Sequence, residues 1–160
     1  MADGVADSKV DEGDQVIARR NIVLCDLDHT ISDARWRDDL IKANDWDAYH
    51  AGFKDDAPCT DIIGLVNSLA ICGYKIYGIT ARPVKWKKAT QDWLIKHGVM
   101  MHELLMRPDT DYQHACALKM ALAGHLLDRV AFILDDREDV CASFKGIGIT
   151  ALAVQGRCYR

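Results

Sequence analysis

The sequence lacks several features that would assign it at once to a broad class of protein. No apolar run approaches the ~20 residues that a membrane-spanning helix needs. None of the six cysteines forms a Cys-x-x-Cys pair, so the spacing typical of a zinc site is absent. The formal net charge is only -4, which argues against non-specific coating of nucleic acid or of an anionic membrane. We therefore expect no membrane contact, although a small local basic patch is still allowed.

Residues 1–20 differ in composition from the rest of the chain. They are polar and acidic, have no apolar period, and lack the apolar core of a secretory signal. We expect a flexible acidic leader over residues 1–20 and a single domain over residues 21–160, because 160 residues suffice for one domain and hardly two. A reduced, cytoplasmic protein is the simplest interpretation, with Cys25 and Cys72 as small core side chains.

Strands and helices are expected to alternate from residue 21 onward. Short apolar runs predict strands at 22–25, 75–79, 104–106, 130–134 and 150–154, and apolar residues at helical spacing predict helices at 60–72, 84–97, 113–125 and 138–145. This order predicts an α/β, Rossmann-like domain: a central parallel sheet with helices on both faces. Ligands bind such sheets at the carboxyl ends of the strands. Residues 31–58 are polar, aromatic and irregular, and are expected to form a small insert.

Acidic residues follow two of the predicted strands directly. Asp26 and Asp28 come after the first strand, and Asp135 and Asp136 come after the strand at 130–134. A lone Asp after a strand is usually a turn or cap residue, but two acidic pairs at buried strand ends are harder to explain in that way. Converging carboxylates repel one another unless a cation lies among them, and oxygen ligands favour Mg²⁺. The pattern therefore predicts a magnesium site and, with it, a phosphate-bearing substrate.

Two further residues are candidates for binding phosphate oxygens. Thr80 follows the strand at 75–79, where a hydroxyl and the free amides at the next helix start could bind phosphate. A capping role is the commoner explanation for a lone threonine in this position. A lone helical lysine is usually solvated, but Leu118 and Met120 place Lys119 near the edge of a buried face, from which it could reach inward.

These residues fall into a known pattern. The segment Asp26-Leu27-Asp28-His29-Thr30 resembles the first motif of the haloacid-dehalogenase (HAD) superfamily, Asp-x-Asp-x-Thr. Thr80 matches the second motif, Lys119 the third, and Asp135-Asp136 the fourth. Weaker sub-motifs within 45–58, 73–83 and 105–107 make the chain look like the phosphatase domain of phage-type polynucleotide kinases. No P-loop occurs in the sequence, so no kinase domain is expected with it.

The resemblance implies a mechanism. Asp26 would attack phosphorus and form an aspartyl-phosphate. Asp28 would act as general acid toward the leaving oxygen and then as general base for water. Thr80 and Lys119 would bind the phosphoryl oxygens. His29 stands where glycine is common in the family, and is expected to alter local geometry or substrate contact rather than abolish activity.

The resemblance also implies a metal site and a substrate contact. Mg²⁺ would be held by Asp26, the backbone carbonyl of Asp28 and Asp136, with Asp135 acting through water. Arg82 is expected to contact substrate, because it closely follows the phosphate-binding residue of the second motif.

The small insert leaves no room for a large cap, so the site should be open to solvent, to a second copy of the chain or to a large substrate. Basic and aromatic residues gather near its expected mouth: Arg35, Trp36, Arg37, Arg82, Lys85, Trp86, Lys87, Lys88 and Arg107. A solvated helix face is the commoner explanation for the run of lysines. The leading hypothesis is a phosphatase acting on nucleotides or on 3′-phosphate ends of nucleic acid. The alternatives are a phosphatase for small phosphometabolites and a catalytically silent phosphate-binding module. The sequence leaves base and sugar preference and the role of His50 open.

Overall fold

A computed structural model of the chain describes residues 20–155. The predicted leader over residues 1–20 therefore lies outside the described residues, apart from its last residue. In the described part of the chain, no helix is long and apolar enough to cross a membrane.

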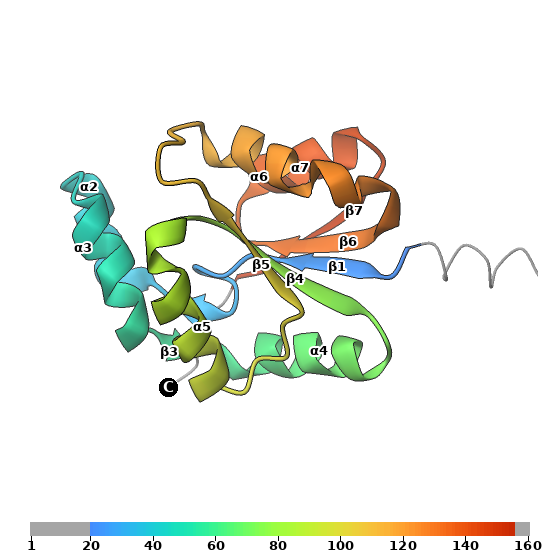
Figure 1. The fold of residues 1–160 in the computed structure, drawn as a ribbon, viewed down its shortest axis with the longest axis horizontal. Helices are drawn as coiled ribbons and strands as arrows, with labels where there is room; N and C mark the ends of the chain where they lie inside the picture. Colours follow the sequence, from blue (N-terminus) through green and yellow to red (C-terminus); the bar gives the residue numbers. More distant parts are fainter. Residues whose placement is uncertain (1–19, 156–160) are drawn as a thin grey trace, which may run out of the picture.

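A five-stranded sheet forms the centre of the fold, in the order β5-β4-β1-β6-β7 (Figure 1). The strands are β1 Ile22–Cys25, β4 Lys75–Pro83, β5 Glu103–Arg107, β6 Val130–Asp135 and β7 Thr150–Ala153. Every neighbouring pair is parallel. All four residues of the central strand β1 are buried, which explains why its sequence is a continuous apolar run rather than an alternating one.

Helices cover both faces of the sheet, as the sequence predicted. Helices α4 Thr60–Ile71 and α5 Lys87–Lys96 lie on one face, and α6 Ala115–Ala123 and α7 Glu138–Gly146 lie on the other (Figure 1). Each face has its own hydrophobic cluster. Val23 of β1 packs with the α4–α5 layer and Leu24 with the α6–α7 layer, because successive side chains of a strand point to opposite faces.

Three predicted elements differ from the structure by more than one residue at an end or in helix type; the others agree within one residue at each end. Strand β4 continues to Pro83 instead of ending at Ile79, because a shift in register after Thr80 pairs Pro83 with Arg107 of β5. The helix predicted at 84–97 begins with a 3₁₀ turn, η3 Val84–Trp86, before α5. The helix predicted at 113–125 is the shorter α6, followed by a 3₁₀ helix, η4 Gly124–Arg129.

The segment over residues 31–58 begins and ends in a small antiparallel pair, β2 Ser32–Asp33 and β3 Ala57–Pro58. Between these strands lie η1 Arg35–Arg37, α2 Asp38–Lys42, α3 Trp46–Ala51 and η2 Gly52–Asp55. Figure 1 shows α2 and α3 beyond the carboxyl end of β1. The segment thus stands at the edge of the sheet where the acidic residues lie.

The two cysteines predicted to be core residues differ. Cys25 is fully buried in β1, as expected. Cys72 is exposed, so that prediction was wrong. Cys72 is the C-cap residue of α4. The next residue, Gly73, has a φ of 97° and turns the chain away from the helix. Ile71 is also exposed, whereas Leu69 and Ala70 pack against the core. Cys72 therefore lies on the solvent side of the end of α4.

Candidate active site

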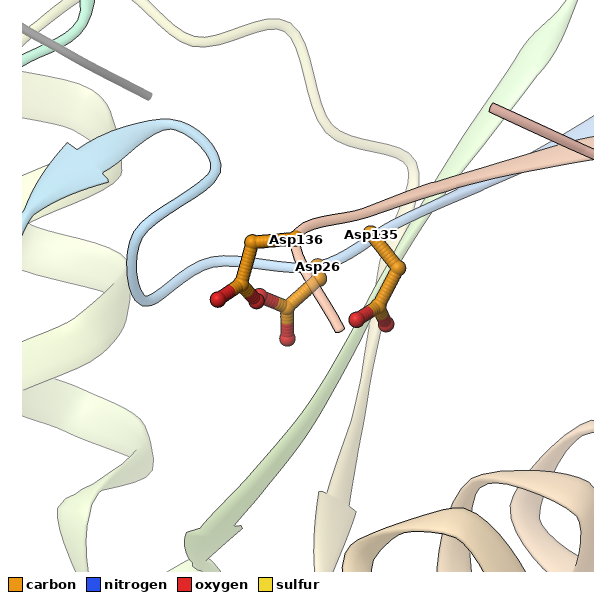
Figure 2. Close-up of side chains that lie close together, drawn as sticks. All are labelled: Asp26, Asp135 and Asp136. Atoms are coloured by element: carbon orange, nitrogen blue, oxygen red, sulfur yellow. The ribbon is translucent and has the colours of Figure 1, made fainter. Parts of the chain in front are cut away.

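Three carboxylates meet where β1 and β6 end. The pairing of Cys25 with Leu134 places Asp26 beside Asp135, and the Asp26 amide donates to the Leu134 carbonyl at 2.9 Å. One ligand oxygen from each of Asp26, Asp135 and Asp136 lies within 4.8 Å of the others. Figure 2 shows the three carboxylates gathered on one side of the strand ends. The sequence placed these acids at neighbouring strand ends, and the parallel register brings them together.

Burial and mutual repulsion make this cluster costly without a cation. Burial raises the pKa of Asp26 well above its usual range; Lys119 opposes the rise and Asp135 adds to it. Burial, followed by repulsion from Asp135, also raises the pKa of Asp136. A divalent cation would favour the ionised forms instead. Because all the donors are carboxylate oxygens, the cluster fits a hard cation.

Lys119 reaches into the cluster from α6. Its side chain is buried, and its Nζ donates to Asp26 Oδ1 and to Asp135 Oδ2, both at 2.6 Å. Burial lowers the pKa of Lys119, but the two carboxylates outweigh burial and hold the pKa above its usual value. Lys119 is therefore a charged partner of the cluster, and its ammonium points inward rather than to solvent.

Two threonines complete the floor of the site. Thr30 Oγ1 donates to Asp26 Oδ2 at 3.1 Å, so each oxygen of the Asp26 carboxylate has a protein donor. Thr80 is buried where β4 becomes irregular, and its Oγ1 accepts from the Arg82 amide at 3.2 Å. The contact from Thr30 was not predicted as a site contact, although this residue is the threonine of the Asp-x-Asp-x-Thr motif.

Asp28 is held between two arginines. Its Oδ1 accepts from Arg37 Nη2 and, at 2.6 Å, from Arg82 Nη2. Burial alone would raise the pKa of Asp28, but Arg82 and Arg37 outweigh it and hold the pKa well below its usual range. Asp28 is thus ionised in this arrangement. Neither guanidinium has exposed surface, so the predicted substrate contact, Arg82, faces Asp28 and not the solvent.

A second carboxylate fixes one of these arginines. Arg37 donates from Nε and Nη2 to the two oxygens of Asp56, at 2.9 and 2.6 Å. The same buried carboxylate accepts from Ser32 Oγ and from Trp36 Nε1, both at 2.9 Å. From the sequence, Arg37 belonged only to a general basic group, and Asp56 only to a weak family sub-motif with no role assigned to it. Their pairing could not be predicted locally, because the partners of Asp56 come from separate parts of the segment over residues 31–58.

The other arginine is held by the body of the domain. Arg82 Nη1 donates to Thr90 Oγ1 of α5 at 2.9 Å. Its guanidinium carbon lies 3.4 Å from the centre of the Phe53 ring. The clamp on Asp28 therefore joins the β4 end, α5 and the segment over residues 31–58.

The two histidines whose roles the sequence left open lie beside this clamp. His29 has a φ of 63°, in the left-handed region that favours glycine, and its Nε2 lies 3.0 Å from Asp38 Oδ1. His50 is largely buried on α3. Burial, together with Arg82 and Arg37, outweighs Asp28 and lowers the pKa of His50 to about 4. His50 is therefore neutral near pH 7.

A cavity of about 840 Å³ opens above these residues. Its lining includes Asp26, Asp28, Thr80, Lys119 and Asp136, which we call its inner part. It also includes Trp46, His50, Lys85, Arg107, Tyr112 and Arg137, which we call its outer part. The predicted basic group lines the cavity only in part: Lys85 and Arg107 do, whereas Arg35 and Lys88 do not. Lys88 pairs with Asp92 on α5, and Arg35 pairs with Asp33, so these side chains serve the surface near their own elements.

The family model described as the polynucleotide kinase PNKP phosphatase domain, a HAD domain, matches residues 20–158. The chain belongs to this family. It is a HAD phosphatase, as its motifs predicted, and its five-stranded parallel sheet is the predicted fold. No curated protein matches the sequence.

Solved structures share the fold of this HAD phosphatase. A chain in a structure of the Pnkp1/Rnl/Hen1 RNA repair complex is 24% identical, with a TM-score of 0.74, over 86% of this chain and 43% of that one. A predicted phosphatase from Clostridium acetobutylicum is 15% identical, with a TM-score of 0.63, over 86% of both chains. The HAD-hydrolase YfnB from Bacillus subtilis, bound to magnesium, is 12% identical, with a TM-score of 0.59, over 83% of this chain and 86% of that one.

This HAD phosphatase thus spans less than half the length of the chain that it matches in the RNA repair complex. At these identities the structural likeness establishes the fold and not the substrate.

Proposed function

We propose that this HAD phosphatase is a magnesium-dependent phosphomonoester hydrolase that works through an aspartyl-phosphate on Asp26 and acts on nucleotides or on 3′-phosphate ends of nucleic acid. The observation that carries the proposal is the setting of Asp26. Its carboxylate lies at the floor of an open cavity, with Lys119 on one oxygen, Thr30 on the other, and two further carboxylates beside it.

In the first step, an Asp26 oxygen forms a bond to phosphorus as the bond from phosphorus to the leaving oxygen breaks. Lys119 reduces the repulsion between the carboxylate and the phosphoryl group, because its ammonium already lies 2.6 Å from Asp26 Oδ1. Thr80, in the same cavity, offers its hydroxyl to a phosphoryl oxygen. In the second step, water attacks the same phosphorus, which releases phosphate and restores Asp26.

Asp28 moves the protons in both steps. An ionised carboxylate suits the second step, in which Asp28 takes a proton from water. The first step needs a protonated Asp28. The negative charge of a phosphoryl group placed beside it opposes the two arginines and raises its pKa, since like charges disfavour ionisation. Arg37 and Arg82 act through Asp28 and are positioning residues.

The residues that would hold Mg²⁺ are Asp26 and Asp136, with the backbone carbonyl of Asp28. Asp135 would act through water, as the family pattern implies, while its oxygens accept from Lys119 Nζ and from the Arg137 amide. When bound, the ion would supply positive charge to the phosphoryl oxygens. The raised pKa values of Asp26 and Asp136 support this proposal.

The open cavity supports a substrate larger than a phosphate group. We propose that residues 31–58 are a small insert in a HAD domain over residues 21–160, which leaves the site accessible to a nucleic-acid end. A phosphatase for small phosphometabolites is the second candidate, because the inner site alone would serve any phosphomonoester. A second copy of the chain covering the site stays a prediction.

Phosphate release should be measured with Mg²⁺ and then with EDTA. The panel holds 5′- and 3′-mononucleotides, a 3′-phosphorylated oligonucleotide and several sugar phosphates. We expect release from the nucleotides or the oligonucleotide, and loss of that release in EDTA. A preference for sugar phosphates would favour the second candidate. Binding of phosphate ligands without release from any of them would show a silent binding module and refute the proposal.

A further inference from the structure

We propose that the outer part of the active-site cavity binds the base of the phosphorylated nucleoside, with Trp46 and Tyr112 as its stacking surfaces. This inference rests on the proposed function, since it names what the nucleotide substrate contacts beyond its phosphate. Trp46 belongs to α3, and Tyr112 belongs to the loop between β5 and α6. Figure 1 shows both elements at the carboxyl-end edge of the sheet, and both residues line the cavity that contains Asp26.

Trp46 is held in place without being buried. Its side chain is 47% exposed, and its Nε1 donates to Asn44 Oδ1 at 2.8 Å. The ring lies edge-on to Tyr49, at 5.9 Å between centroids, and is stacked on His50 at 6.1 Å. A large aromatic surface that is fixed but left open to a cavity is suited to receive another flat ring.

The same contacts connect Trp46 with the catalytic residues. The guanidinium carbon of Arg37 lies 4.0 Å from the centre of the Tyr49 ring, and Arg37 binds Asp28. A ring stacked on Trp46 would therefore be positioned by the same elements that position the general acid.

Tyr112 lies on the other element that lines the cavity. Its side chain is 90% exposed, so its ring contributes little to the core. The loop around it is nevertheless fixed. Arg107 Nη1 donates to the carbonyls of Asp111 and Gln113, both at 2.9 Å, and Arg107 Nε donates to the Ala81 carbonyl at 2.8 Å. The protein thus holds an exposed aromatic ring close to the phosphate-binding end of β4.

The charges of the outer part of the cavity favour binding of a nucleobase over binding of a long sugar–phosphate backbone. Its cations already have carboxylate partners: Lys85 pairs with Asp47, Arg107 with Asp111 and Arg137 with Asp139. A continuous track of unpaired cations, which would bind successive phosphates, is therefore missing from the outer cavity that the described residues form. The terminal nucleoside should supply most of the specificity, with little preference among bases, because every base has a face that can stack.

Steady-state kinetics on matched substrates test this inference. The substrates are a 3′-mononucleotide, a 3′-phosphorylated trinucleotide, the same trinucleotide with an abasic 3′ residue, and glycerol phosphate. The variants are Trp46→Ala, Trp46→Phe and Tyr112→Ala, with Ile95→Ala as the control, since Ile95 is exposed on α5 and is not part of the cavity.

We expect Trp46→Ala and Tyr112→Ala each to raise KM for the two substrates with a base on the 3′-terminal residue by roughly 5- to 150-fold, the range expected for one base–aromatic stack. Turnover should change little, and KM for the abasic trinucleotide and glycerol phosphate should stay near that of the parent protein. Trp46→Phe should recover most of the affinity. Similar KM values for the mononucleotide and the trinucleotide would place the specificity in one nucleoside. A much lower KM for the trinucleotide would overturn that part of the inference.

Equal KM values for the normal and abasic trinucleotides in the parent protein would overturn the inference while leaving the phosphatase activity intact. A uniform fall in turnover on all four substrates would overturn it as well, because that result indicates a structural role. Failure of the proposed function looks different, since no substrate would then release phosphate. Binding of a 3′-mononucleotide should in that case still quench tryptophan fluorescence in the parent protein, and less in Trp46→Ala; equal quenching would overturn the stacking site independently.

Discussion

At the ends of β1 and β6 the acidic side chains follow regular strands directly, whereas over residues 31–58 the charged side chains come from short helices and turns. In the first region the register of the sheet brings Asp26 and Asp135 together. In the second, Asp56 accepts hydrogen bonds from Ser32, Trp36 and Arg37, and the spacing of a regular helix or strand does not predict these contacts. The strand-end region contains the proposed reacting groups, and the irregular segment supplies Arg37, which together with Arg82 of β4 sets the charge of Asp28. We therefore expect this segment to influence catalysis through Asp28.

The largest expected effect lies at the strand ends. Asp26→Asn removes the proposed nucleophile and should lower turnover on the order of 10⁴-fold or more. The fold should persist, because asparagine keeps the shape of the side chain and removes one of the repelling charges of the cluster. Turnover and the thermal midpoint should be measured together. Near-native turnover in this variant would refute the assignment of Asp26 as the nucleophile.

Substitutions in the segment over residues 31–58 should mainly lower the stability of the protein, whereas Asp26→Asn mainly lowers turnover. Asp56→Ala leaves the fully buried Arg37 without its bidentate partner, and should cost about 3–5 kcal/mol in the free energy of unfolding. Asp33→Asn is the matched control, since Asp33 pairs with the exposed Arg35 and should cost within about 0.5 kcal/mol. Denaturant unfolding of both variants measures the difference.

A similar cost in the two variants would contradict the role of Asp56 as the anchor of the segment. Any Asp56 variant that still folds should also show a shifted pH profile for turnover, because loss of the Arg37 position weakens the clamp that lowers the pKa of Asp28.

These two regions also differ in how far the sequence predicted them. Asp26, Asp135 and Lys119 could be placed because each stands at a fixed position on a strand or helix, and regular elements have known geometry. The clamp around Asp28 could not, because Arg37, Asp56 and Thr90 are brought together only by tertiary packing. Arg82 shows both sides: its nearness to Thr80 was visible in the sequence, but its burial against Phe53, which turns it toward Asp28, was not.

Removal of the metal should lower the stability of the protein through the carboxylates at the strand ends. Because the pKa values of Asp26 and Asp136 are raised, their contribution to stability is present at low pH and is lost as the pH rises through these values. In EDTA the thermal midpoint should therefore fall as the pH rises above the ordinary range of carboxyl groups. Mg²⁺ at about 100 times its Kd should restore about 2.7 kcal/mol.

Asp136→Asn sharpens this measurement. It removes one carboxylate of the cluster, so both the fall in EDTA and the gain with Mg²⁺ should shrink. A thermal midpoint that responds to Mg²⁺ equally in this variant and in the parent protein would place the ion elsewhere.

The smallest expected effect lies where the two regions join. His29 adopts a φ of 63° directly after Asp28, and its ring pairs with Asp38 of α2. His29→Gly relieves backbone strain of roughly 1 kcal/mol, but it loses the partly exposed contact with Asp38, worth no more than about 1 kcal/mol. Glycine also adds freedom to the unfolded chain. These terms nearly cancel, so the unfolding free energy should change by less than about 1 kcal/mol and turnover should be largely kept. A collapse of turnover with an unchanged fold would instead show that the His29–Asp38 link positions the catalytic acid as firmly as the arginines do.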